Sequence, residues 1–93
     1  MRLPKLENGE YDVDQIKAMV DRFMAAGMKY FDTAWVYDGG GSERMARECL
    51  VDRYPRESFY LATKVMAGMG VTTAEKTRQE LEESLERTGA GYF

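Results

Sequence analysis

An acid, a phenol and an amine in this 93-residue chain stand at spacings that could bring their side chains together. Asp32 lies near the end of the run Met28–Thr33, and Tyr37 follows five residues after it. Lys64 ends a second run of similar character, Ser58–Lys64. If the two runs are neighbouring parallel strands, the acid and the amine share one side of the sheet at its carboxyl edge, where α/β folds build their sites.

The chemistry that these groups could perform is proton donation by Tyr37. A free tyrosine has a pKa of about 10 and is a poor acid at neutral pH. A neighbouring Lys64 ammonium favours the phenolate and lowers that pKa, while Asp32 would orient the ammonium. Tyr37 could then protonate a carbonyl oxygen as hydride reaches the carbon. The alternative remains that Asp32 and Lys64 form a structural ion pair and that Tyr37 is a packed ring.

The first elements expected are a helix, a strand and a loop. Asp12 is placed to cap a helix that has Gln15 at its third position, and Gly27 suits the left-handed end of that helix. The next segment, Met28–Thr33, is expected to form a strand after a tight connection. Val36–Gly41 is expected to be a loop, since three consecutive glycines disfavour regular structure.

A second helix, a second strand and a third helix are expected after the loop. Ser42 is placed to cap the second helix, which ends before Tyr54-Pro55 because the residue before proline is driven out of the helical region. The second strand is Ser58–Lys64. Thr72, with Glu75 three residues later, predicts a capping box for the third helix.

The third helix is expected to lie on the surface of something larger. Its narrow apolar stripe consists of Ala74, Leu81 and Leu85, and its charged remainder is expected to be a solvated face. Gly89 ends this helix, and Tyr92-Phe93 is expected to begin another strand.

This order of elements predicts an α/β fold. Strands separated by helices form right-handed βαβ units and a parallel sheet. Parallel sheets are covered on both faces, which two strands with their helices cannot achieve alone. The chain is therefore expected to be part of a larger α/β fold.

Composition excludes several classes of function. The net charge of −3 is opposite to the basic character of nucleic-acid-binding proteins. There is no apolar run of membrane-spanning length and no signal-peptide pattern, so no membrane association is expected. The single cysteine, Cys49, fits a reducing cytoplasm and a packed thiol. The absence of histidine excludes His-ligated metal sites and Ser-His-Asp or Cys-His catalysis, so no metal is expected.

The sequence resembles the aldo-keto reductases. The resemblance is carried by Phe31-Asp32-Thr33-Ala34-Trp35-Val36-Tyr37, then Gly41-Ser42-Glu43, then Leu61-Ala62-Thr63-Lys64, and it covers nearly all of the chain. It implies a (β/α)8 TIM barrel that reduces carbonyl groups to alcohols with NADPH as the cofactor.

The resemblance also implies roles for single residues. Tyr37 matches the proton donor, Lys64 the cation that lowers its pKa, and Asp32 the partner that holds Lys64 and also contacts the cofactor. Trp35 and Val36 match positions that help to line the substrate pocket. The substrate of the complete enzyme would be a small carbonyl compound.

The sequence departs from the family pattern in three ways. The catalytic histidine of the family is missing, as is the glycine-rich first strand, and most cofactor contacts of the family lie in the later half of the barrel. We therefore expect residues 1–93 to be a single N-terminal fragment of about two to three βα units, incomplete as a monomer. Alone it should be inactive, with doubtful NADPH binding. The alternative is a non-catalytic module that self-associates or docks on a partner.

Two loops offer weaker alternatives. Gly39-Gly40-Gly41 before a helix could suggest phosphate binding, but the lysine of a P-loop is missing and Glu43 would repel an anion. A flexible, capped connection accounts better for these glycines. The segment Met66–Gly70, directly after Lys64, would border the active site of a whole barrel.

Overall fold

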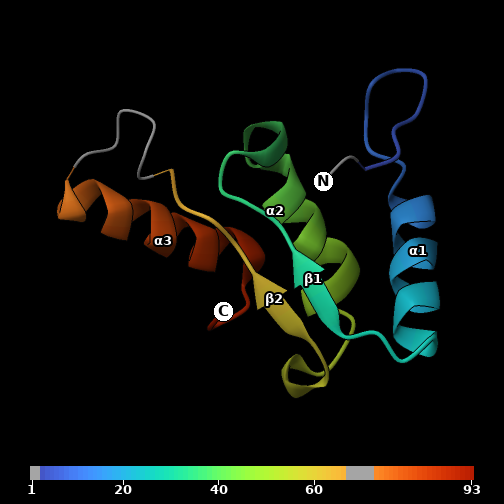
Figure 1. Cartoon of the computed structure of the whole chain (residues 1–93). Helices are drawn as coiled ribbons and strands as arrows, with labels where there is room; N and C mark the ends of the chain where they lie inside the picture. The colour runs from blue at the N-terminus through green and yellow to red at the C-terminus, as the bar shows by residue number, and fades with distance from the viewer. Residues whose placement is uncertain (1–2, 67–72) are drawn as a thin grey trace.

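A computed structural model describes residues 3–66 and 73–93 (Figure 1). In chain order its helices and strands are α1 (Val13–Ala25), β1 (Tyr30–Asp32), a 3-10 turn (Tyr37–Gly40), α2 (Gly41–Ala46), a π turn (Arg47–Val51), a 3-10 turn (Arg56–Ser58), β2 (Tyr60–Ala62) and α3 (Ala74–Thr88). The predicted α/β order is therefore confirmed. The loop Met66–Gly70 named above lies, apart from Met66, outside the described residues.

The two strands are parallel neighbours, as predicted. Phe31 pairs with Leu61 at the centre of the register, and backbone hydrogen bonds continue the pairing beyond both strands, from Thr33 N to Ala62 O (2.9 Å) and from Trp35 N to Lys64 O (3.0 Å). Both strands are shorter than predicted, at three residues each. The second begins late because the chain after Pro55 first forms the 3-10 turn Arg56–Ser58.

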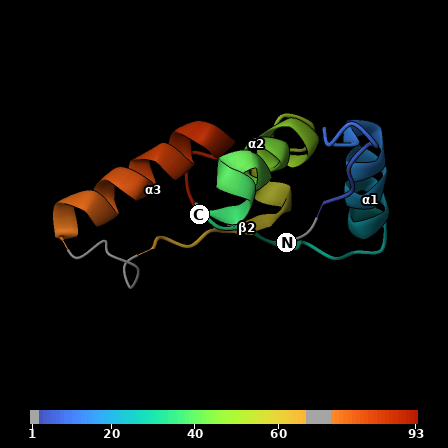
Figure 2. The same cartoon turned by 90° about the horizontal axis from the view of Figure 1, so that it is seen from above.

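The helices α2 and α3 lie on one face of the sheet, while the described residues place no element on the other face (Figure 2). The molecule is a slab of 40 × 35 × 18 Å, and its thinnest dimension fits one helix layer and one sheet layer. Strand alternation divides the side chains, so that Phe59 and Leu61 are buried while Tyr30 and Tyr60 are 61% and 68% exposed.

The core is small and lies between the strands, α1 and the π turn. Its buried cluster consists of Leu50, Phe59, Leu61 and Ala90. Phe31 joins this cluster to α1, with its ring 4.9 Å from that of Phe23 and 6.3 Å, edge to face, from that of Phe59. Such aromatic pairs each contribute about 0.5–1.5 kcal/mol beyond the area they bury.

Helix α1 begins and ends as the sequence predicts. The Asp12 side chain accepts a hydrogen bond from Gln15 N (3.2 Å), which satisfies one of the donors left free at the start of a helix. Gly27 follows the last turn with a φ of +85°, a conformation that glycine adopts without the steric cost of a side chain.

The start of α2 differs from the prediction. Ser42 does not cap the helix; Gly40 occupies the capping position in a left-handed conformation, and the helix begins at Gly41. The Ser42 hydroxyl instead lies 2.7 Å from the hydroxyl of Thr33, and both side chains are buried. The expected loop Val36–Gly41 is thus a 3-10 turn, Tyr37–Gly40, with Asp38 and Gly39 in left-handed conformations, and only its last residue, Gly41, belongs to α2.

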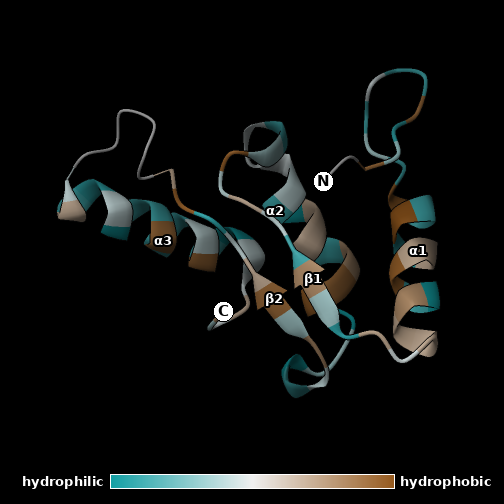
Figure 3. Cartoon of the chain, viewed as in Figure 1, coloured by the Kyte–Doolittle hydropathy of each residue, from teal (hydrophilic) through white to brown (hydrophobic). Residues whose placement is uncertain are grey.

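Helix α3 differs from the prediction at its start and at its buried face. Thr73, rather than Thr72, caps the helix by accepting from Lys76 N (3.2 Å), and Thr72 lies outside the described residues. Of the expected apolar stripe, Ala74 and Leu81 are exposed and Leu85 is partly buried. The buried side chains of α3 are polar, namely Glu80, Ser84 and Thr88. Figure 3 shows this helix as mostly hydrophilic.

The last residues of the chain follow α3 without forming a further strand. Gly89 ends α3 in the left-handed conformation, as predicted. Tyr92 and Phe93 form no strand, and the Arg56 side chain donates to Tyr92 O. No helix formed by residues 3–66 or 73–93 is both long enough and apolar enough to cross a membrane.

Candidate active site

The side chains of Asp32, Tyr37 and Lys64 meet beyond the carboxyl ends of β1 and β2. The Lys64 ammonium donates to Asp32 Oδ2 (2.7 Å) and to Thr33 O (3.0 Å). Its third neighbour is the Tyr37 hydroxyl, 3.4 Å away, and the ammonium lies 5.0 Å from the centre of that ring. The cation therefore stands between the carboxylate and the phenol.

The electrostatics of this cluster are dominated by Lys64. The hydrogen bond to Asp32 raises the pKa of the ammonium above its ordinary value, against a smaller opposing effect of burial, and the Tyr37 hydroxyl adds to the increase. Lys64 is thus a permanent cation at neutral pH. Its side chain and that of Asp32 are about half exposed, at 49% and 48%, so solvent screens their ion pair.

The turn that carries Tyr37 is anchored by the N-terminal segment. Asp38, next to Tyr37, adopts a φ of +52° and accepts a hydrogen bond from the Tyr11 hydroxyl (3.0 Å). Burial, followed by this hydrogen bond, raises the pKa of Tyr11. A Cβ added to Gly41 would lie 2.0 Å from the Tyr11 oxygen, so only glycine allows this approach. Lys5 adds a distant ion pair to Asp38 (3.8 Å).

Trp35 and Val36, the predicted substrate-pocket residues, have different environments. The indole Nε1 of Trp35 donates to Glu83 Oε2 of α3 (2.8 Å), and the guanidinium of Arg87 lies 5.3 Å from the indole ring centre. The Val36 side chain is 43% exposed. The structure thus directs the Trp35 indole toward α3 and leaves Val36 in solvent.

A buried ion pair behind the strand ends escaped the sequence analysis. Glu43 is fully buried and accepts from Thr63 Oγ1 (2.6 Å) and from Arg87 (3.2 Å). From the sequence, Glu43 belongs to the Gly41-Ser42-Glu43 segment and would repel phosphate, and Arg87 belongs to the expected solvated face of the third helix; neither pattern predicts that the two pair. The one available signal was Glu83, four residues before Arg87, a spacing that pairs opposite charges on a helix.

Glu80 is a second correction to the expected solvated face. Its side chain is only 5% exposed, and its Oε2 accepts from Met66 N (3.2 Å), two residues after Lys64. Helix α3 therefore contacts the chain beyond the second strand through Glu80 to Met66, and contacts α2 through Arg87 to Glu43.

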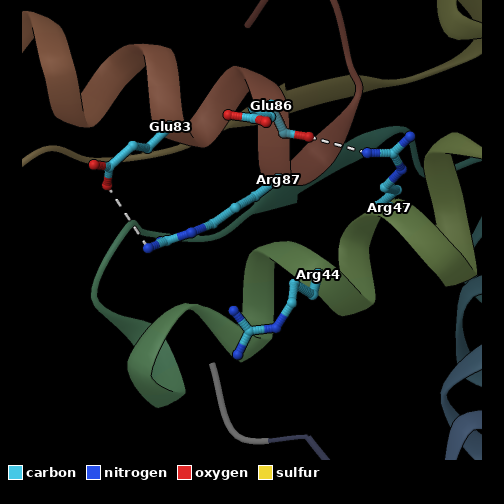
Figure 4. Close-up of a pocket in the computed structure, with 5 residues that line it drawn as sticks. All are labelled: Arg44, Arg47, Glu83, Glu86 and Arg87. Atoms are coloured by element: carbon cyan, nitrogen blue, oxygen red, sulfur yellow. Dashed lines mark hydrogen bonds and ion pairs between the residues drawn. The ribbon is translucent and has the colours of Figure 1, made fainter.

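The surface groove between α2 and α3 is lined by Arg44, Arg47, Glu83, Glu86 and Arg87 (Figure 4). Arg47 donates to Glu86 O (3.0 Å), and Arg87 pairs with Glu83 (3.8 Å). The two carboxylates offset most of the positive charge, so the groove is a poor site for an anion.

Cys49, on the π turn, is a buried thiol. Burial raises the pKa of the Cys49 thiol, which fits the packed thiol expected from the sequence. Within the part of the chain that the structure describes, no group of three acidic or cysteine side chains is placed to hold a metal ion.

A dinucleotide does not fit the described residues by themselves. The cavity that includes Asp32 is lined by apolar side chains of α1 and β1, among them Ile16, Val20 and Phe23, and lacks cationic groups for phosphates. The cluster around Lys64 is half open to solvent. These residues could contact one end of a cofactor, and the larger part of such a site would have to come from elsewhere.

The chain matches the Aldo/keto reductase family over residues 1–93. It is 34% identical over 76 residues to norsolorinic acid reductase stcV of Emericella nidulans, covering 82% of this chain and 20% of that protein. It is 31% identical over 74 residues to the norsolorinic acid reductase of Aspergillus flavus, covering 80% and 19%.

A relative with a different name is the putative voltage-gated potassium channel subunit beta of Schizosaccharomyces pombe, 29% identical, with 91% of this chain and 27% of that protein covered. The chain thus spans about a fifth to a quarter of the length of these relatives. No solved structure matches it significantly. The family match over the whole of residues 1–93 shows that this chain belongs to the aldo/keto reductase family.

Proposed function

We propose that this chain is the part of an NADPH-dependent aldo-keto reductase that supplies the proton donor and the cation beside it. The observation that carries the proposal is the position of the Lys64 ammonium, 2.7 Å from Asp32 and 3.4 Å from the Tyr37 hydroxyl. Family membership supports the reaction class, and the surrounding (β/α)8 barrel is part of the proposal. A cytoplasmic location, favoured by the single buried thiol, also belongs to it.

The three residues would divide the chemistry. Tyr37 donates its hydroxyl proton to the carbonyl oxygen of a small substrate. Lys64 stabilises the negative charge that remains on the phenol oxygen, because a cation at this distance favours the ionised form. Asp32 fixes the ammonium through their short hydrogen bond, so that little reorganisation is needed during proton transfer. Val36, which is exposed, would line the substrate side, whereas Trp35 could contribute only the part of its side chain that does not face α3.

The 93-residue chain alone should not reduce carbonyl compounds. It contains no histidine to complete the family's catalytic set, and the cavity that Asp32 helps to line has no cationic side chain among its described lining residues. Aldo-keto reductases generally use NADP(H), and binding by this chain alone is expected to be weak. Tyr37-dependent NADPH oxidation by the purified chain would overturn this part of the proposal.

The catalytic roles can be tested in a chimera. In it, this chain replaces the matching stretch of the Emericella nidulans reductase, and NADPH oxidation is followed with norsolorinic acid, the substrate in that protein's name. We expect measurable turnover that Tyr37→Phe reduces by about 10²- to 10⁴-fold, the range for loss of a general acid. An active chimera that Tyr37→Phe leaves unchanged would refute the assignment.

A second proposal is that the chain alone acts as an associating module. The exposed Tyr30 and Tyr60 side chains stand on a sheet face that no described element covers, and each strand has one unpaired edge. Such faces and edges favour pairing with another chain. Light scattering should show self-association that weakens when both tyrosines are replaced by lysine. A cleanly monomeric chain with a cooperative calorimetric transition would exclude this proposal.

A further inference from the structure

We propose that Arg87 is a positioning residue that sets the separation between Lys64 and Tyr37 through the buried carboxylate of Glu43. The inference rests on the proposed function, because it concerns the geometry of the same site. Arg87 lies on α3, far along the chain from the three proposed catalytic residues, and touches none of them. It acts through their neighbours.

The first set of Arg87 contacts, called the first arm, is with the backbone just before Tyr37. One nitrogen of Arg87, Nη1, donates to the backbone oxygen of Trp35 (2.9 Å). Tyr37 is two residues further, and its N donates to Ala34 O (3.2 Å), so the anchored segment is a single tight turn. Fixing the Trp35 carbonyl therefore restricts the position from which the Tyr37 side chain extends.

The second arm reaches the strand that carries Lys64. The same Nη1 atom donates to Glu43 Oε2 (3.2 Å), while Glu43 Oε1 accepts from the Thr63 hydroxyl (2.6 Å). Thr63 directly precedes Lys64. Glu43 is fully buried and the Arg87 side chain is only 25% exposed, so this path is shielded from solvent. One guanidinium thereby holds both chain segments of the site.

The third arm holds the indole of Trp35. Glu83 Oε2 accepts from Trp35 Nε1 (2.8 Å) and pairs with Arg87 Nη2 (3.8 Å), and the guanidinium lies over the indole face at 5.3 Å. In Figure 4 the side chain of Arg87 extends from α3 toward Glu83 across the groove that faces α2. Only the planar fork of arginine can make these contacts together; a lysine would keep the charge and lose them.

The purified 93-residue chain offers two readouts that need no catalysis. Trp35 is its only tryptophan, so quenching of the fluorescence by acrylamide reports on the indole alone. The approach of the Lys64 side chain to the Tyr37 ring can be followed by nuclear Overhauser contacts between them, assigned with Lys64→Met and Tyr37→Phe. Thermal melting, recorded beside both, reports on stability.

The test compares Arg87→Lys with Arg47→Lys. Arg47 lines the same groove and links the π turn to α3, but no hydrogen bond or ion pair joins it to Trp35 or Glu43. We expect Arg87→Lys to increase Trp35 quenching about twofold or more and to weaken the Lys64–Tyr37 contact by a similar factor, because the guanidinium fork is lost. Arg47→Lys should leave both readouts unchanged. Unchanged readouts in folded Arg87→Lys would overturn the inference.

A double variant separates positioning from stability. Arg87→Met alone leaves the buried Glu43 carboxylate unpaired and can unfold the chain. The double variant Glu43→Gln/Arg87→Met removes both charges, so we expect it to melt at a higher temperature than Arg87→Met and still to lack the Lys64–Tyr37 contact. Recovery of that contact together with stability would show a merely structural pair and reject the inference.

Glu83→Ala tests the indole arm in a variant that should remain folded, since the Glu83 side chain is 38% exposed. Trp35 quenching should rise while the Lys64–Tyr37 contact persists; no change in quenching would contradict this arm. Because all of these measurements are made without substrate or cofactor, their failure is distinct from failure of the proposed reaction, which the chimera with Tyr37→Phe decides.

Discussion

Among the described residues, a carboxylate, a cation and a phenol come together around Lys64, around Asp21 and around Asp38, and the first two of these clusters differ instructively. At the carboxyl ends of the strands, Lys64 stands between Asp32 and Tyr37. The second cluster joins α1 to the segment after the π turn and consists of Asp21, Arg53 and Tyr54. The two clusters contain the same chemical groups in a different order of contact.

In the second cluster the carboxylate occupies the middle. Asp21 receives two hydrogen bonds from Arg53 (2.9 and 2.8 Å) and one from the Tyr54 hydroxyl. The hydrogen bond to Asp21 raises the pKa of Tyr54, so this phenol retains its proton. In the first cluster the neighbour of the phenol oxygen is instead a cation, the Lys64 ammonium at 3.4 Å. The two clusters therefore differ in which group the phenol contacts, the cation or the carboxylate. This difference, rather than the residue types, separates a candidate proton donor from a structural ion pair.

Removing the cation from each cluster should give the largest difference. In the chimera, Lys64→Met should lower kcat by about 10²-fold or more, because the charge beside the Tyr37 oxygen is lost. Arg53→Met should leave kcat within about threefold and lower the melting temperature instead. Steady-state kinetics of the two variants would make the comparison. Equal effects on kcat would remove the functional distinction between the clusters.

Neutralising the carboxylate of each cluster in the 93-residue chain should change the melting temperature moderately. The second cluster, around Asp21, should lose more stability than the first, around Asp32. Asp21→Asn loses the charge to which Arg53 Nη2 and the Tyr54 hydroxyl donate, and should lower the melting temperature by about 4–8 °C. The Asp32 carboxylate is as exposed as that of Asp21 but accepts a single hydrogen bond from the described residues, that from Lys64, so Asp32→Asn should change the melting temperature by less than about 3 °C. Scanning calorimetry at pH 7 would measure both. A larger loss from Asp32→Asn would show that the first cluster is a structural tie after all.

The smallest effects should come from pH. The Arg53 hydrogen bonds, followed by that from Tyr54, lower the pKa of Asp21 below 3.8. Its contribution is therefore fully present above that pH and is lost as pH falls through the lower folded value. Asp21→Asn should flatten this acid-side fall in melting temperature, and an unchanged fall would contradict the assignment.

At alkaline pH both clusters should contribute less to the stability of the chain, the second because Tyr54 loses its proton and the first because Lys64 does. The folded pKa of Tyr54 is raised above 10.0 and that of Lys64 above 10.5. Each contribution is present below the ordinary value and is lost as pH rises through the folded value. Melting curves of Tyr54→Phe and Lys64→Met above pH 10 should each show a shallower decline than the unaltered chain. A decline as steep as that of the unaltered chain would show that the replaced residue does not cause the alkaline loss of stability.

The sequence was most informative where the signal is local or periodic. Asp12 and Gly27 marked the ends of α1 because capping and a left-handed residue depend on a few adjacent positions. Alternation along the strands placed Asp32 and Lys64 on one side, and the parallel order of elements brought them to one edge. These inferences needed only spacing and the handedness of βαβ connections.

The sequence was least informative where a polar side chain is buried by a partner distant along the chain. Ser42 was expected to cap a helix and instead meets Thr33, while Glu43 and Arg87, forty-four residues apart, form a pair. Polar residues on a helix predict a solvent-exposed face, unless the partner that compensates the cost of burying them is known.

The sequence by itself thus determined the order of elements, the parallel pairing and the convergence of Asp32 with Lys64, because these follow from periodicity and chain direction. Only the tertiary structure decided which polar groups of α2 and α3 are buried and how Arg87 ties Trp35 to Glu43. The physical reason is that burial of a charge depends on a partner brought close by folding, and no local pattern encodes that partner.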